Sequence, residues 1–160
     1  MKRMWSKNEL KNIADIQAKG VKKDIASLVD ADGNPRFAEG DITMDEVEGF
    51  TQTYGKWSLS GSHLMIVLAG LVADTTAYTG GKLASVNLPQ WIIDKIAIIF
   101  SAVVSFKSIP AYAANWSTQN LSVALRKPST SSITITGENS VTFTADRAFR
   151  IEFDLLIDIE

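Results

Sequence analysis

The sequence predicts a mainly β protein: an antiparallel β-sandwich, jelly-roll-like, with a short helix at the amino terminus. Three observations predict it. Most apolar segments alternate with polar residues at a period of two, which is typical of strands with one buried face. Gly, Pro, Asn and Asp separate these segments. Helical periodicity is largely confined to the start of the chain. We expect a helical segment over residues 1–24 and a β-sandwich domain over residues 25–160.

Composition limits the classes of function. The chain has 160 residues, enough for one core, and its 16 basic and 18 acidic residues give a net charge of -2. No basic surface for nucleic acid or an anionic membrane is expected. The absence of Cys excludes disulfides, thiolate zinc sites and a cysteine nucleophile, and fits folding in a reducing cytoplasm. The apolar runs Leu64–Ala73 and Ile92–Val104 are too short or too interrupted to span a membrane.

A helix is predicted over Lys7–Lys19, because Ser6 and Glu9 have the spacing of a capping box. Leu10 and Ile13 lie on its narrow apolar face. Such a helix is marginal alone and needs a partner, either its own domain or a neighbouring subunit. Leu10 and Ile13 are therefore candidate oligomer contacts.

The segment after this helix predicts a short strand, Ile25–Val29, and a turn over residues 30–35. Asp30, Asp32 and Asn34 alternate as calcium ligands do, but Gly33 stands at the fourth position, where an EF-hand needs Gly at the sixth. A plain hairpin is favoured, and no metal is expected.

The polar residues 39–54 predict a solvated loop, with a short helical turn over Thr43–Glu48. Besides Glu39, its carboxylates are Asp41, Asp45, Glu46 and Glu48. General acid–base work requires burial to raise the pKa of one of them, and the segment offers little apolar cover. A solvated face is the expected outcome.

The stretch Trp57–Ala73 predicts the central core strand. It begins with large apolar residues alternating with serines and becomes continuously apolar over Leu64–Leu71, as in a strand covered on both faces. In so small a domain, a second copy of the chain would supply one cover. His63, Met65 and Val67 are therefore candidate interface residues, and the lone His63 fits a hydrogen-bonded core or interface role better than a ligand or base.

The remaining elements follow in order. Residues 74–83 predict a polar connection, and its Gly80-Gly81 pair lacks a phosphate-binding pattern. Pro89 predicts the start of a short helix, followed by a β-branched strand over Ile98–Phe106. Alternating segments then predict an antiparallel meander that ends in a long strand, over residues 121–126, 133–136, 141–144 and 149–159.

The loop Pro110–Gln119 carries the candidate ligand contacts, Tyr112 and Trp116. Exposed on a loop, these aromatic rings would stack on sugar rings; the alternative is that they pack beneath it. Elsewhere no residues combine into a catalytic site, so no enzymatic activity and no cofactor are expected. A cupin-type metal site would need several His, and the chain has one.

The chain resembles small structural proteins of tailed bacteriophages and prophages of Gram-positive hosts, of the fibre-tip, tail or head-fibre type. The resemblance is carried by the segments MKRMWSKNELK, DADGNPRF, HLMIVLAGLVA, LPQWIIDKI and FRIEFDLLI. It implies a virion component made in the bacterial cytoplasm, a homotrimer that contacts other virion proteins. It also implies that the helix bundles on a threefold axis or attaches to the particle, while the β domain decorates it or contacts the host surface.

The function predicted from the sequence is therefore a non-enzymatic virion structural protein: a trimeric fibre, tail or decoration component. The alternative is a carbohydrate-binding module that uses Tyr112 and Trp116 on a host glycan.

Overall fold

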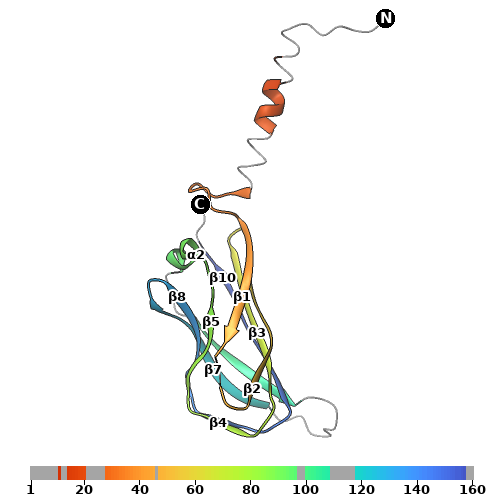
Figure 1. Cartoon of the computed structure of the whole chain (residues 1–160), viewed down its shortest axis with the longest axis vertical. Helices are drawn as coiled ribbons and strands as arrows, with labels where there is room; N and C mark the ends of the chain where they lie inside the picture. The colour runs from red at the N-terminus through yellow and green to blue at the C-terminus, as the bar shows by residue number, and fades with distance from the viewer. Residues whose placement is uncertain are drawn as a thin grey trace, which may run out of the picture.

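The computed structural model describes residues 11, 14–20, 28–45, 47–96, 100–108 and 118–157. Eight strands form a closed antiparallel barrel in the order β1-β2-β3-β10-β6-β7-β8-β5, and β5 returns to pair with β1 (Figure 1). A two-stranded ribbon, β4-β9, and a short helix, α2, complete the fold. The elements are β1 (Phe37–Met44), β2 (Phe50–Ser60), β3 (His63–Val72), β4 (Thr76–Tyr78), β5 (Gly81–Val86), α2 (Gln90–Lys95), β6 (Phe100–Ser108), β7 (Thr118–Ser129), β8 (Ser132–Gly137), β9 (Val141–Phe143) and β10 (Arg147–Leu156).

The mainly β, antiparallel class is confirmed, and the two faces of the predicted sandwich are joined at both edges into a barrel. The short helix after Pro89 and the strand that follows it are also confirmed, as α2 and β6. The meander holds for β6, β7 and β8 and then ends, because β9 pairs with β4, and β10 lies between β3 and β6. Strand order across the barrel is set by long-range pairing, which local alternation does not encode.

The core stretch Trp57–Ala73 is a hairpin, so the prediction of a single strand was wrong. β2 ends at Ser60, and a turn at Gly61 and Ser62 leads into β3. Gly61 has φ of 60°, a conformation that glycine adopts without steric cost. Met65 on the outer face of β3 is exposed in the single chain, so the cover expected there from a second copy of the chain stays a prediction.

The loop predicted over residues 39–54 was wrong as well, because β1 and the start of β2 occupy most of it. Ile42 lies in the core, and the indole of Trp57 lies against Gly40. Small residues at alternate positions of β1 leave room for large side chains from β2, so this strand has little hydrophobic signal of its own.

β1 changes partner along its length, which shapes the barrel. Its first half pairs with β2, from Phe37 opposite Ser60 to Asp41 opposite Lys56, and its second half pairs with β5. Where β2 leaves the ladder, the Gln52 side chain replaces it: Nε2 donates to the Ile42 carbonyl at 2.8 Å, and Oε1 accepts from the Met44 amide at 2.7 Å. A strand that switches sheets in this way makes a corner.

The two ends of the barrel are closed differently (Figure 1). At one end α2 buries Ile92 and Ile93, and Lys127 Nζ donates to the Ile93 carbonyl at 2.7 Å, where a cation favours the helix dipole. Towards the other end, β4 and β9 contribute to an aromatic cluster around Phe50. Its ring centroid lies 6.0, 5.5 and 5.8 Å from those of Tyr78, Phe143 and Phe149, respectively.

The turn over residues 30–35 is the predicted hairpin. The buried Asp30 carboxylate accepts from the Asp32 and Asn34 amides at 3.0 and 2.7 Å and from Asn34 Nδ2 at 3.0 Å. Lys95 Nζ lies 3.6 Å from the same carboxylate. Burial raises the pKa of Asp30, but the Asn34 hydrogen bonds and the Lys95 charge outweigh it and hold this pKa below its ordinary value. Of the strand expected over Ile25–Val29, only Leu28 and Val29 are described: Leu28 is helical, which contradicts the prediction there, and Val29 forms an isolated bridge with Pro35.

The predicted amino-terminal helix is present over the described residues 14–20, all of them exposed. Ile16 is 69% exposed. The sequence left open whether this helix packs on its own domain or on a neighbouring subunit. Its described part does not pack on its own barrel. Among the described helices, none has the length and apolar character needed to cross a membrane.

Candidate functional site

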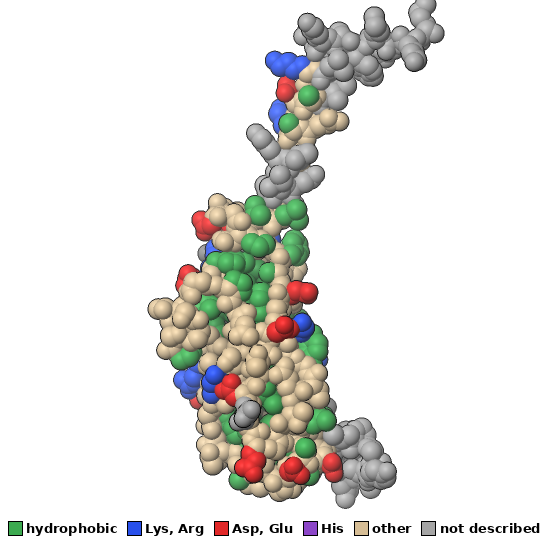
Figure 2. All heavy atoms as spheres, viewed as in Figure 1, with side chains coloured by type: hydrophobic (Ala, Val, Ile, Leu, Met, Phe, Trp, Pro, Cys, Tyr) green, Lys and Arg blue, Asp and Glu red, His purple; other side chains and the backbone are tan. Residues whose placement is uncertain are grey.

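An apolar band lies on the barrel end nearest the amino-terminal helix; it consists of Leu28, Phe37, Met65 and Leu156. Phe37 is 58% and Leu156 73% exposed. The strand register places Phe37 of β1 and Leu156 of β10 at the two ends of one row, with Ser60 of β2 and His63 of β3 between them. The Arg36 amide donates to the Leu28 carbonyl at 2.8 Å, which brings Leu28 beside this row. Figure 2 shows hydrophobic side chains gathered on this end.

Three of the predicted interface residues lie on β3. Met65 belongs to the band and is 39% exposed. His63 is exposed in the same row as Phe37 and Leu156, with Nδ1 3.4 Å from Asp154 Oδ1. Val67 is only 6% exposed, although alternation along β3 places it on the outer face beside Lys56, its register partner on β2. The structure thus brings His63 and Met65 together on an open surface, whereas Val67 is already covered.

The other predicted site residues lie outside the described residues. These are the interface candidates Leu10 and Ile13 and the ligand candidates Tyr112 and Trp116. They remain predictions.

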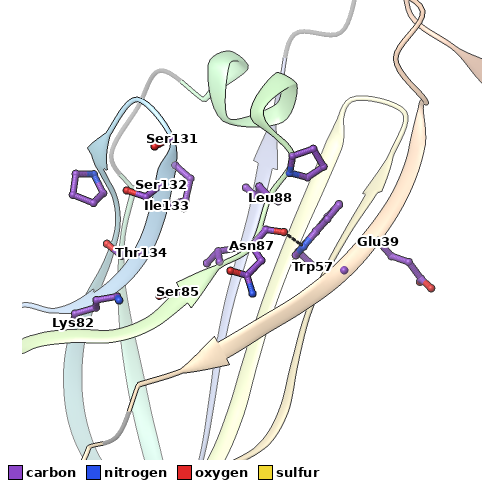
Figure 3. A pocket seen from close by; sticks show the side chains of 14 residues that line it. Glu39, Trp57, Lys82, Ser85, Asn87, Leu88, Ser131, Ser132, Ile133 and Thr134 are labelled. Atoms are coloured by element: carbon purple, nitrogen blue, oxygen red, sulfur yellow. Dashed lines mark hydrogen bonds between the residues drawn. The ribbon is translucent and has the colours of Figure 1, made fainter.

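A hollow of about 720 Å³ opens on the barrel wall where β1 separates from β5 (Figure 3). We call it the seam hollow. Within the described residues, β1 pairs with β5 only over Ile42–Met44, so the first half of β1 diverges from the neighbouring wall. β5 and the loop after it form the floor, and the turn between β7 and β8 forms the opposite side. The side chains and backbone that line it come from Glu39, Gly40, Trp57, Lys82, Ser85, Val86, Asn87, Leu88, Pro89, Pro128, Ser131, Ser132, Ile133 and Thr134.

Trp57 fixes one wall of the seam hollow. Its Nε1 donates to the Asn87 carbonyl at 2.9 Å, which ties β2 to the loop after β5. The indole is 3% exposed, so it presents an edge to the hollow and no open stacking face. A methyl group at Gly40 would lie 2.6 Å from Nε1, so β1 needs glycine at this crossing.

The polar side chains of the hollow are mostly uncharged hydroxyls and amides, on Ser85, Asn87, Ser131, Ser132 and Thr134. The cation Lys82 is partly neutralised, since its Nζ lies 3.2 Å from Asp45 Oδ2. The Glu39 carboxylate points away from the hollow in Figure 3, so Glu39 contributes mainly backbone. The site therefore presents hydrogen-bonding groups with little net charge.

No local pattern in the sequence predicts the seam hollow. Its lining comes from four separate stretches of the chain that meet only when β1 switches from β2 to β5. The sequence offered only a slight signal for the hollow. Gly40 lies three residues after Phe37, in a segment where small residues occupy alternate positions.

Comparison with known proteins gives a likeness to a solved structure. No family model and no curated protein matches the chain. A reovirus attachment protein, sigma1, solved in complex with α-2,3-sialyllactose, is similar with a TM-score of 0.41 and 5% sequence identity. The similarity covers 78% of this chain and 67% of that chain. This is a weak likeness to a viral attachment protein and carries no assignment of function, which is argued from the chain's own residues.

Proposed function

We propose that this chain is a non-enzymatic structural component of a phage or prophage virion, a homotrimeric fibre, tail or decoration protein with the barrel as its exposed domain. In this role the amino-terminal helix joins copies or attaches them to other virion proteins. The barrel contacts the host surface. The family resemblance of the sequence supplies the virion setting and the threefold stoichiometry.

The observation that carries the proposal is the uncovered apolar band. Exposed apolar residues are ordinary when scattered, but a group of them on one end of a domain is typical of an association surface. The helix over the described residues 14–20, drawn beyond this end of the barrel in Figure 1, adds the exposed apolar residue Ile16. Association through the apolar band and the helix would bury the narrow apolar face of the helix, which is too small to stabilise an isolated helix in water.

A homo-oligomer with closed symmetry suits these surfaces. A shared axis near the helix would bring three copies of the band together and leave the far ends of the barrels open for contact with other molecules. Leu156 and Phe37 would then be buried together with the outer face of Met65. His63 and Ser60 lie between Phe37 and Leu156 in the same row and would be buried with them.

The test is the mass of the protein in solution, by sedimentation velocity at micromolar concentration. We expect a trimer for the native chain and a monomer for the double variant Met65→Asp, Leu156→Asp. The control is Tyr54→Asp, which also introduces an acid at an exposed apolar position of the β2–β3 outer face, opposite Ala69 and away from the band. A monomeric native chain would remove the proposal, and a trimer that survives the double variant would remove the band as its interface.

A further inference from the structure

We propose that the seam hollow binds a neutral oligosaccharide. This inference deepens the host-surface role proposed above and rests on it for its biological setting. The residues that carry it are distinct from the loop aromatics Tyr112 and Trp116 and from the apolar band.

The shape of the hollow suits a ligand of a few sugar rings. Its volume of about 720 Å³ falls within the range of small-molecule sites, which are concave and largely preformed. Its walls are strands, held by Trp57 Nε1 to the Asn87 carbonyl at 2.9 Å and by Ser129 Oγ to Ser132 Oγ at 2.7 Å. A ligand would therefore meet groups that are already in place.

The chemistry of the lining matches sugar hydroxyls. A hydroxyl both donates and accepts, and Ser, Thr and Asn side chains offer both functions as well. The near-neutral lining disfavours phosphates and nucleotides, which need several cations or an open array of amides. Leu88, Pro89 and Pro128 supply apolar patches for the C–H faces of a sugar.

The backbone of β1 adds a second set of groups. The Ile42 carbonyl and the Met44 amide point towards β2, where Gln52 binds them. Main-chain groups alternate sides along a strand, so those of Glu39, which lines the hollow, point to the opposite edge. Within the described residues no strand pairs with that edge before Ile42, and an unpaired strand edge needs polar partners.

The hollow lacks an open aromatic platform, so single-site affinity would be weak. Stacking on an exposed ring is a large share of many sugar contacts, and the buried indole of Trp57 offers only an edge. Several copies in one particle compensate, because linked weak sites gain effective concentration. This expectation ties the hollow to an assembled, multi-copy protein.

The experiment is saturation-transfer NMR on the full chain with lactose, maltotriose and triacetylchitotriose as probes, followed by amide-shift mapping with any probe that binds. We expect at least one probe to bind and to shift amides of β5 and β8 at the hollow. The double variant Ser85→Ala, Asn87→Ala keeps the Asn87 carbonyl that holds Trp57. It should weaken binding about tenfold, since two ligand hydrogen bonds are lost. The control pair Thr51→Ala, Thr53→Ala removes two exposed hydroxyls of β2 outside the hollow and should bind as the native chain does.

Three results would overturn the inference: no binding by any probe, shifts that map elsewhere, or unchanged binding by the hollow variant. Each is independent of the mass measurement. A monomer that binds sugar removes the trimer and leaves the hollow intact, whereas a trimer that binds none does the reverse.

Discussion

Replacement of Gly40 by alanine should destabilise the barrel more than a substitution on the surface of a strand usually does. The added methyl would lie 2.6 Å from Trp57 Nε1 and 2.7 Å from two further indole carbons. Ordinary contact needs about 3.5–4.0 Å, so the indole must move by roughly 1 Å. It has little room, because it is 3% exposed.

The expected cost has two parts. Overpacking of a filled core costs about 1–3 kcal/mol, and losing the hydrogen bond from Trp57 to the Asn87 carbonyl costs about 1 kcal/mol more. A total of about 2–4 kcal/mol corresponds to a fall in melting temperature of about 5–15 °C for a domain of this size. Urea denaturation followed by circular dichroism would measure the free energy of unfolding directly.

A double-mutant cycle tests whether the cost of Gly40→Ala comes from contact with the indole of Trp57. In a Trp57→Phe background the smaller ring lacks the indole N–H and the benzo edge, so Gly40→Ala should cost about 1–2 kcal/mol less than it does alone. Gly20→Ala is the control, since nothing lies within 4 Å of the added methyl and the residue is exposed. Equal stability of Gly40→Ala and the native chain, or strict additivity in the cycle, would refute the clash.

Three further predictions concern single contacts. Hydrogen bonds and a nearby cation lower the pKa of Asp30, so its contribution to stability is present above the ordinary pKa of 3.8 and is lost as the pH falls through the lowered pKa. A carboxyl NMR titration should find this lowered pKa, and the variant Asn34→Ala should raise it. Lys127→Met keeps the aliphatic stem but removes the donor to the last turn of α2, and should cost about 1–2 kcal/mol in urea denaturation; no loss would mean that water replaces the ammonium. Gly137→Ala would place a methyl in steric conflict with the Tyr78 hydroxyl oxygen and should lower the free energy of unfolding by about 1–3 kcal/mol. Burial raises the pKa of Tyr78, so displacement of the ring should bring this pKa back towards its ordinary value in a spectrophotometric titration. An unchanged titration would contradict the clash.

Local pattern was sufficient for several elements. Alternation over residues 149–159 predicts most of β10 (Arg147–Leu156), whose burial alternates residue by residue, and Pro89 predicts the start of α2. Asp30, Gly33 and Asn34 predict the turn that the structure shows. In each case the physical cause is short-range: side-chain period, fixed φ of proline, or a carboxylate that binds amides two and four residues ahead.

The candidate sites were predicted less completely. His63 and Met65 were identified as interface residues because continuous apolar character in a small domain implies an external cover, and the structure leaves both on an open face. Val67 was assigned to the same surface, but it is already covered within the single chain. The seam hollow was missed, because no one stretch of sequence contains it.

The sequence by itself determined the strand content and the antiparallel class, since these depend on composition and on periods of two residues. Only the tertiary structure decided that β1 changes partner, that Gly40 faces Trp57, and that serines and an asparagine from distant stretches meet beside them. The reason is that strand order and register arise from pairing between segments far apart in the chain. The need for glycine at position 40 of β1 arises only because the indole of Trp57 packs against it in the folded barrel.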